Sequence, residues 1–295
     1  MNNMATLSEV IERFIFAKQA ERYSHWTIED YSKTYKKFID FVDPNTPFKF
    51  IDALTVWQFL ADQDQVADKT LCNYHTALSS LYTWAVEHDY ADTHVLNKVK
   101  RPTFVVPEMV PYTQAEVTKI LRSCRYTRDR AIVLVLLDTG MRASELCALQ
   151  LDDWVDQTLQ IRCGKGKKSR IVPISDKTDQ LILKQLKKRR IGVNGLAGGD
   201  GLFASNISGN PLCYTSLASL MERLGKYSGV QGVHCHRFRH TFAITFLRNG
   251  GNIFTLKKIL GHSTLMMVQR YLAIAQSDVV EAHAVASPVT VWGLG

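Results

Sequence analysis

Three prolines interrupt the chain between two long stretches of helix-like sequence. Pro102, Pro107 and Pro111 lie close together in the segment VKRPTFVVPEMVPYT. A proline in a helix interior removes a backbone hydrogen bond and clashes with the preceding turn, so no regular helix runs through this segment. We therefore expect an extended linker at about 99–111. It divides the 295 residues into two domains, each long enough to bury its own core.

The segment before the linker is predicted to be a small helical bundle, residues 1–98. Apolar residues recur at helical spacing in TLSEVIERFIFAKQ, WTIEDYSKTYKKFIDFV, LTVWQFLADQ and TLCNYHTALSSLYTWAVEHDY. Thr6 or Ser8 is available to cap the first of these helices.

The segment after the linker is predicted to be mostly helical with one small sheet. Thr113 and Glu116 have the spacing of a capping box, which opens the first helix of a domain over 112–286. The apolar run DRAIVLVLLDTG predicts a helix that ends at Gly140, whereas LQIRC and SRIVPI predict two strands around GKGKK. A short helix at about 276–286 and a tail, 287–295, with an exposed Trp292 complete the expected fold, which is mainly α.

Composition excludes several classes of protein. Hydrophobic residues make up 46% and charged residues 22% of the chain, which is typical of globular proteins. No apolar window is long enough to predict a membrane span, and the first residues lack the pattern of a signal peptide. The six cysteines are scattered without a C-x-x-C pair, so free thiols and a cytoplasmic protein are expected.

Charge is distributed unevenly along the chain. Residues 1–100 carry 10 Lys and Arg against 14 Asp and Glu, whereas the remaining residues carry 26 against 14. A basic second part favours a polyanionic partner, and nucleic acid is the usual one. Charge alone fits a basic enzyme that does not bind nucleic acid equally well.

The most unusual short segment is HCHRFRH, residues 234–240, at the start of a predicted helix. His236 and Arg239 are three residues apart, so their side chains share one face of that helix. Arg237 points about 100° away from His236, whereas His240 falls back near it. The segment therefore predicts a cluster of histidine and arginine side chains on one helix face.

Neither a metal site nor a nucleotide site is expected. His234, Cys235 and His236 are adjacent in sequence, so their side chains diverge, and the neighbouring arginines would repel a divalent cation. The segment GKGKKS lacks the first glycine and the Ser or Thr position of a phosphate-binding P-loop. We expect no cofactor.

Five segments, in this order, resemble the sequence boxes of the tyrosine recombinase (phage integrase) family. They are TGMRASEL (139–146), GKGKKSRIVP (164–173), HRFRH (236–240), LGHS (260–263) and QRYL (269–272). Tyr271 follows His262 by nine residues, as the family pattern has it. The resemblance covers most of 110–285. The N-terminal bundle is similar to the SAM-like core-binding domain of that family in size and helicity.

The resemblance implies that Tyr271 attacks a DNA phosphodiester and forms a 3′-phosphotyrosyl link, while Arg142 and Arg239 hold the non-bridging oxygens. Two guanidinium groups suit this task because they stay charged and present a planar fork of donors. A phenol with a pKa near ~10 requires roughly 4 kcal/mol to ionise at pH 7, so neighbouring cations and a base matter.

Three further residues receive roles from the same resemblance. Lys165 would give a proton to the departing 5′ oxygen, and His236 would accept or relay the tyrosine proton. His262 would hydrogen-bond the phosphate. Taken singly, each predicted site residue also has an ordinary structural explanation; Arg142, for example, could pair with Glu145 at a helix end. Only the joint pattern favours catalysis.

The partners implied are a double-stranded DNA recombination site, a homotetramer on paired sites and accessory DNA-bending proteins, in a nucleoid-associated protein. In this family the C-terminal segment often docks on a neighbouring protomer, which we also expect here. The predicted DNA contacts are Lys33, Lys36, Lys37, Lys167 and Arg170. For the first three, a solvated helix side explains the sequence equally well.

Two rival functions stay open at this point. A type IB topoisomerase uses the same tyrosine chemistry but relaxes supercoils without a specific site. A DNA-binding protein without catalysis would only organise or repress a site, although the full set of Arg, Lys, His and Tyr argues against it.

Overall fold

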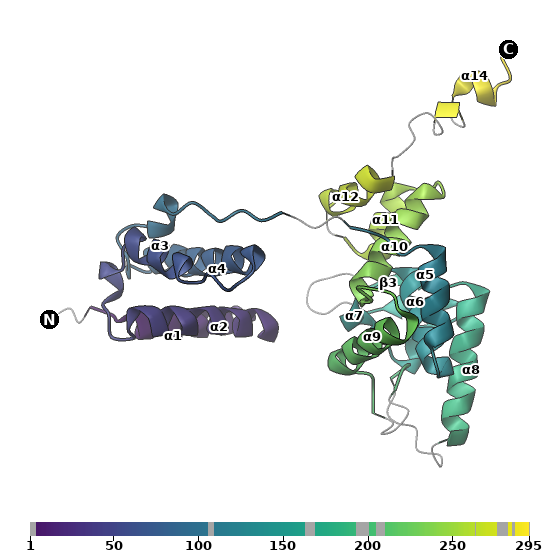
Figure 1. Ribbon diagram of the computed structural model, residues 1–295, viewed down its shortest axis with the longest axis horizontal. Coiled ribbons are helices and arrows are strands. Elements are labelled where there is room, and N and C mark those ends of the chain that lie inside the picture. Colours follow the sequence, from purple (N-terminus) through teal and green to yellow (C-terminus); the bar gives the residue numbers. More distant parts are fainter. Residues whose placement is uncertain are drawn as a thin grey trace. The chain divides into compact units, whose positions relative to one another are not determined.

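The computed structural model describes residues 4–105, 109–162, 169–192, 201–204, 210–262, 264–275, 283–284 and 287–294. The chain divides into two compact units, Met1–Pro107 and Glu108–Gly295 (Figure 1). The division falls within the proline-containing segment. Both units are mainly helical, and the second contains a small sheet, so the predicted fold class is confirmed. Within the described ranges, no helix is long and apolar enough to cross a membrane.

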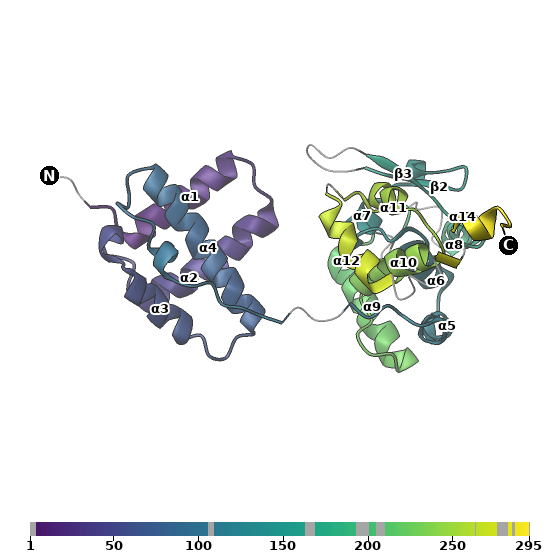
Figure 2. The same ribbon diagram turned by 90° about the horizontal axis from the view of Figure 1, so that it is seen from above.

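The first unit is a bundle of helices, as its apolar spacing predicts (Figure 2). It contains α1 (Leu7–Ala20), α2 (His25–Val42), α3 (Ala53–Ala61) and α4 (Asp68–Glu87), with 3₁₀ turns at Phe48–Phe50 and Val95–Lys98. Thr6, one of the two expected caps, begins α1 in a capping box with Glu9. The helices bury aromatic side chains such as Phe14, Phe38 and Phe59, which form one core.

The chain after the last 3₁₀ turn stays packed on this unit. Val99 is buried in its core, and the carbonyl oxygen of Val99 is 2.9 Å from Nε2 of His75. The thiol of Cys72 donates to the carbonyl oxygen of Pro102 at 2.9 Å. These contacts place residues 99–102 with the first unit.

In the second unit, several helices pack around one apolar helix, α6 (Thr127–Thr139). The helices of this unit are α5 (Gln114–Ser123), α6 (Thr127–Thr139), α7 (Ala143–Ala148), α8 (Asp176–Gly192), α9 (Tyr214–Ser228), α10 (Cys235–Arg248), α11 (Ile253–Leu260), α12 (Met266–Ala275) and α14 (Pro288–Val291). The predicted capping box of Thr113 with Glu116 opens α5, and Gly140 ends α6, as expected. Ile132, Val133 and Leu136 of α6 are fully buried, which explains its apolar sequence.

The sheet has three antiparallel strands in the order β1 (Trp154–Val155), β2 (Thr158–Ile161) and β3 (Arg170–Pro173). The hairpin of β2 and β3 is confirmed, whereas β1 was not expected. Asp156 and Gln157 form the turn between β1 and β2 with φ of 46° and 58°, a left-handed pair that hairpins normally obtain from Asn-Gly. The hairpin tip, 163–168, lies outside the described residues.

Two apolar clusters meet along α10. Phe238 belongs to the core around α6, whereas Ala243 and Ile244 belong to a second cluster with α11 and α12. α10 therefore packs against α6, α11 and α12 (Figure 2). This packing brings the start of α10 near the ends of α6 and α11. The helix predicted at about 276–286 falls mostly outside the described residues, whereas Trp292 is exposed, as expected.

Candidate active site

The ends of two helices hold one buried arginine. Arg239, on α10, is only 2% exposed. Its guanidinium donates to the carbonyl oxygen of Gly140 at 2.7 Å and to that of Leu260 at 2.9 Å. Gly140 and Gly261 follow α6 and α11 in the left-handed conformation, with φ of 59° and 64°, which ends both helices there. Carbonyl groups at helix C-termini carry partial negative charge, so they stabilise this cation without neutralising it.

Arg239 keeps a full positive charge at neutral pH. Burial first, and then the charge of the nearby Arg142, lower its pKa to about 10. Its hydrogen bonds go to two carbonyl groups and to His262. Among the residues that the structure describes, no carboxylate pairs with Arg239, so an anion would find a desolvated cation at this position.

His262, directly after α11, is 8% exposed and accepts a hydrogen bond at Nε2 from Arg239. Because an arginine can only donate, Nδ1 must carry the proton of the neutral ring. Burial and the charge of Arg239 lower the pKa of His262 to about 4, so the ring is neutral at pH 7. Among the described residues, Nδ1 has no hydrogen-bond partner. It is a donor that suits a phosphate oxygen.

Arg142, the N-cap of α7, does make the ion pair with Glu145 that its sequence position allows, at 2.9 Å. The same carboxylate also accepts from both Nη atoms of Arg170 on β3, at 3.0 and 2.7 Å. Burial alone would raise the pKa of Glu145, but the hydrogen bonds from Arg170 and Arg142 outweigh it and bring the pKa to about 2. Two arginines thus share one carboxylate, which leaves a net positive charge.

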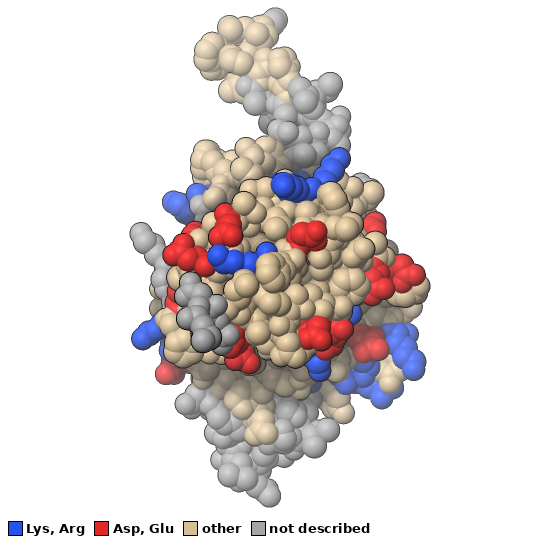
Figure 3. Space-filling view, turned by 90° about the vertical axis from the view of Figure 1, so that its left-hand side faces the viewer, with Lys and Arg blue, Asp and Glu red and all other residues tan. Residues whose placement is uncertain are grey.

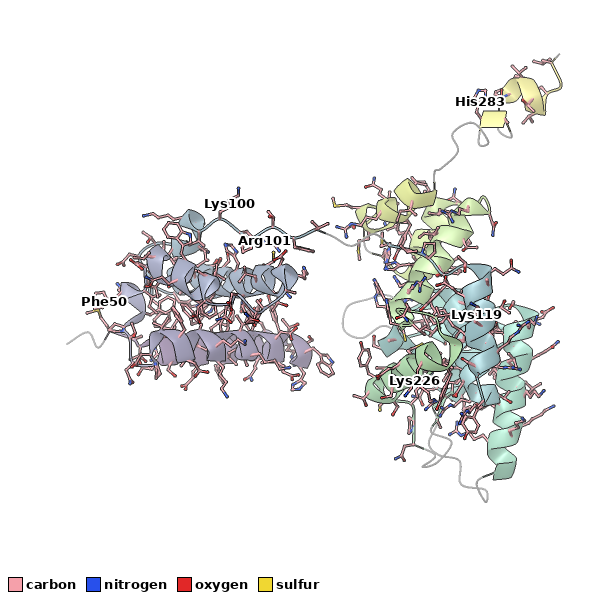
Figure 4. All side chains as sticks on the ribbon, in the orientation of Figure 1. Phe50, Lys100, Arg101, Lys119, Lys226 and His283 are labelled. Carbon is pink, nitrogen blue, oxygen red and sulfur yellow. The ribbon has the colours of Figure 1, made fainter. Side chains whose placement is uncertain are left out.

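Arg142, His236 and Arg239 line a single cavity of about 890 Å³. The other residues that line it come from α7, from α9 and from the chain between α9 and α10. Lys226 of α9, labelled in Figure 4, is one of these residues. The two guanidinium groups therefore face one space, as the predicted phosphate site requires.

Tyr271, on α12, is 4% exposed and lies beside the same cluster. Its hydroxyl oxygen is 3.0 Å from Nδ1 of His240, and its ring lies parallel to that of His262, with centroids 6.3 Å apart. Burial raises the pKa of Tyr271, whereas the positive charges of Arg239 and Arg142 act to lower it. The phenol is thus within electrostatic reach of both arginines.

The structure gives the contact with the tyrosine hydroxyl to His240 and not to His236. His236 is exposed, and its ring packs edge-on against that of His240, with centroids 4.2 Å apart. Sequence reasoning placed His240 near His236 but gave it no role. Its helical spacing of four residues from His236 was the available signal.

The sequence also singled out other residues in the second unit. Arg170 is nearly buried between Glu145 and the carbonyl oxygen of Ile259, to which its Nε donates at 2.6 Å. Lys165 and Lys167 lie outside the described residues. Arg237 points away from the cluster, as expected, and donates to Glu116 at 2.9 Å.

Lys33, Lys36 and Lys37 line a groove between α2 and α4, of about 740 Å³. Lys33 bonds to Glu29 at 2.7 Å, and Lys37 lies 5.6 Å from the centre of the Tyr74 ring. On the face shown in Figure 3, basic side chains are interspersed with acidic ones. The DNA contacts of Lys33, Lys36 and Lys37 stay predictions.

Within the part of the chain that the structure describes, no group of three or more His, Cys, Asp or Glu side chains could hold a metal ion.

Comparison with known proteins identifies the family. The chain is 29% identical to tyrosine recombinase XerA of Saccharolobus solfataricus over 266 residues, which cover 85% of this chain and 84% of that protein. It is 26% identical to tyrosine recombinase XerC of Bacillus pumilus over 300 residues, covering 95% and 96%.

Solved structures share the fold. A lambda integrase dimer bound to a COC′ core site matches with a TM-score of 0.75 at 19% identity, over 90% of this chain and 77% of that one. The family models agree: residues 10–92 match the N-terminal SAM-like domain of phage integrases, and residues 112–278 match the phage integrase family. The chain therefore belongs to the phage integrase family, the tyrosine recombinases, which are enzymes of site-specific DNA recombination.

Proposed function

We propose that this enzyme cleaves and rejoins DNA through a covalent 3′-phosphotyrosyl intermediate at Tyr271, without metal or nucleotide cofactor. The observation that carries the proposal is the convergence of Arg142 and Arg239 on one cavity, with Tyr271 within reach of both charges. A phosphodiester transition state gathers charge on its non-bridging oxygens, and fixed cations in a buried site stabilise that charge strongly.

In the proposed cleavage step, the phenol oxygen of Tyr271 forms a bond to phosphorus as its proton passes to a histidine ring of α10, and the bond from phosphorus to the 5′ oxygen breaks. The 5′ oxygen takes a proton from an acid, a role we assign to Lys165. Arg142, Arg239 and the Nδ1–H of His262 hold the non-bridging oxygens. The reverse sequence rejoins a strand, and no energy source is needed because the phosphoester is kept.

Double-stranded DNA is the proposed substrate. We assign catalysis to residues 112–286 and DNA binding to residues 1–98. In the latter, the lysines of the groove between α2 and α4 would contact the DNA. Structures of lambda integrase as a dimer on a core site and as a tetramer on a Holliday junction support a homotetramer on two paired sites. Accessory DNA-bending proteins and association with the nucleoid belong to the same proposal. Because phosphate contacts dominate, binding should weaken steeply with salt.

The experiment is to trap the covalent complex. DNA fragments protected by the protein from nuclease are sequenced, and a nicked version of the recovered site is then used as a suicide substrate. Wild-type protein should form an adduct that survives denaturation and carries the DNA on Tyr271. Tyr271→Phe should form none yet bind the site with nearly unchanged affinity.

A matched control uses another tyrosine of the same unit. Tyr126 is 55% exposed, and Tyr126→Phe should form the adduct at the wild-type rate. A wild-type protein that binds its site without any adduct would refute catalysis. Relaxation of supercoiled plasmids that lack the site would instead show topoisomerase activity.

A further inference from the structure

The hydroxyl of the proposed nucleophile contacts a histidine side chain. Nδ1 of His240 lies 3.0 Å from the Tyr271 oxygen, and the two ring centroids are 5.4 Å apart. His240 lies on α10 and Tyr271 on α12, two helices that pack closely against each other. This contact therefore comes from the core of the second unit and not from a surface loop.

We propose that His240 is a further catalytic residue, which accepts the hydroxyl proton of Tyr271 as the phenol oxygen attacks the phosphate. The inference rests on the proposed function, because it assigns the proton acceptor of that same step.

The surroundings of His240 keep its ring ready to accept. Burial first, and then the charges of His236, His234 and Arg239, lower the pKa of His240 to about 4. The ring is therefore neutral at pH 7, and one nitrogen offers a lone pair. The proposal requires that the Tyr271 hydroxyl donates to Nδ1 of His240, which lies 3.0 Å away, and that Nε2 carries the ring proton.

A neutral histidine with so low a pKa does not ionise a resting phenol, so the transfer must accompany bond formation. As the phenol oxygen bonds to phosphorus, its remaining proton becomes strongly acidic. The bound phosphate also places negative charge near the imidazole, which favours its protonated form. The O–H bond of Tyr271 breaks, the proton goes to Nδ1 of His240, and the oxygen lone pair forms the P–O bond.

This assignment separates the two histidines of α10. His240 is half-buried against Tyr271, whereas His236 is exposed and lines the cavity that Arg142 and Arg239 share. The ring of His236 packs edge-on against that of His240 and shields it on that side. His236 is thus placed toward the substrate, and His240 toward the nucleophile.

The test compares single-turnover cleavage rates of the full-length protein on the suicide substrate. His240→Ala removes the acceptor, whereas His240→Asn keeps an oxygen that can accept a hydrogen bond but cannot take a proton. Both variants should cleave at least about 100-fold more slowly, the usual contribution of a general base. Thr245→Ala, an exposed position of α10, is the matched control and should cleave at the wild-type rate.

A second substrate identifies which proton is affected. Replacing the 5′ bridging oxygen by sulfur provides a leaving group that departs without protonation, because a thiol is far more acidic than an alcohol. A His240 variant should stay equally slow on this substrate, since the defect concerns the nucleophile. A defect that disappears with sulfur would place His240 on the leaving group, and wild-type rates for His240→Ala or His240→Asn would equally overturn the proposal.

Nitrogen-15 NMR of the histidine rings tests the same contact without DNA. At neutral pH, Nδ1 of His240 should be unprotonated and Nε2 protonated, and Tyr271→Phe should shift the Nδ1 resonance. The opposite tautomer would overturn the proposal. If wild-type protein shows the expected tautomer but forms no adduct, the proposed function fails. If it forms the adduct and His240→Ala does too at full rate, only the role of His240 fails.

Discussion

The carboxylate of Glu145 offers a quantitative test of what holds the two arginines of the proposed phosphate site in place. Its pKa is about 2 against an ordinary value of 4.5, although its side chain is only 11% exposed. At ~1.36 kcal/mol for each pKa unit, this shift corresponds to about 3 kcal/mol of stability at neutral pH. Arg170 donates two of the hydrogen bonds that produce it. Because Arg142 contributes the rest, Arg170→Met should cost between about 1 and 3 kcal/mol, since it leaves a buried charge only partly compensated.

The sign of the pH dependence follows from the direction of the shift. Because the pKa of Glu145 is lowered in the folded state, its contribution is complete above about pH 4.5 and is lost as the pH falls toward 2. The difference in unfolding free energy between wild type and Arg170→Met should thus narrow below about pH 4.5.

The assay is unfolding in urea, monitored by hydrogen exchange on peptides from α6. These peptides report the stability of the second unit alone. The double variant Glu145→Met with Arg170→Met should cost much less than the two single variants added together, because it removes the buried charge with its partner. Lys119→Met, an exposed position of α5 labelled in Figure 4, is the control and should change stability little. A cost below about 1 kcal/mol for Arg170→Met, or additive single costs, would refute this reasoning.

Two further predictions concern the same site. Gly140→Ala should destabilise the protein by roughly 2 kcal/mol or more and slow adduct formation, because φ is +59° and the new Cβ would lie 2.6 Å from Phe242. Gly229→Ala is the control: its φ is +70° but no atom lies within 4 Å, so it should cost only about 1 kcal/mol when both variants are compared by thermal unfolding. Folding lowers the pKa of His262 from 6.5 to about 4, so the unfolded state binds the proton more readily than the folded state. As the pH falls from 6.5 to 4, the free energy of unfolding should therefore decrease by up to about 3 kcal/mol. His262→Gln should remove that part of the slope in urea unfolding at several pH values; an unchanged slope would contradict a neutral, buried ring.

Local chemistry explains why so much of the fold was predictable. Helix caps and apolar periods act within a few residues of each other, so they can be recognised without tertiary contacts. Examples are the cap at Thr6, the capping box at Thr113 and the helix end at Gly140. The strand β1 was not predicted because the turn after it contains Asp156 and Gln157 in place of the glycine that usually marks such a turn.

The sequence by itself determined the division at the prolines, the helical elements and the family, and it nominated both guanidinium groups and the tyrosine. It could not decide which histidine meets Tyr271, because His236 and His240 share one helix face and only the packing of α10 on α12 selects between them. Nor could it show that Arg170 of β3 holds Glu145 of α7, 25 residues away in the chain. Contacts of this kind depend on how separate elements pack, and side-chain spacing along one element carries no information about its neighbours.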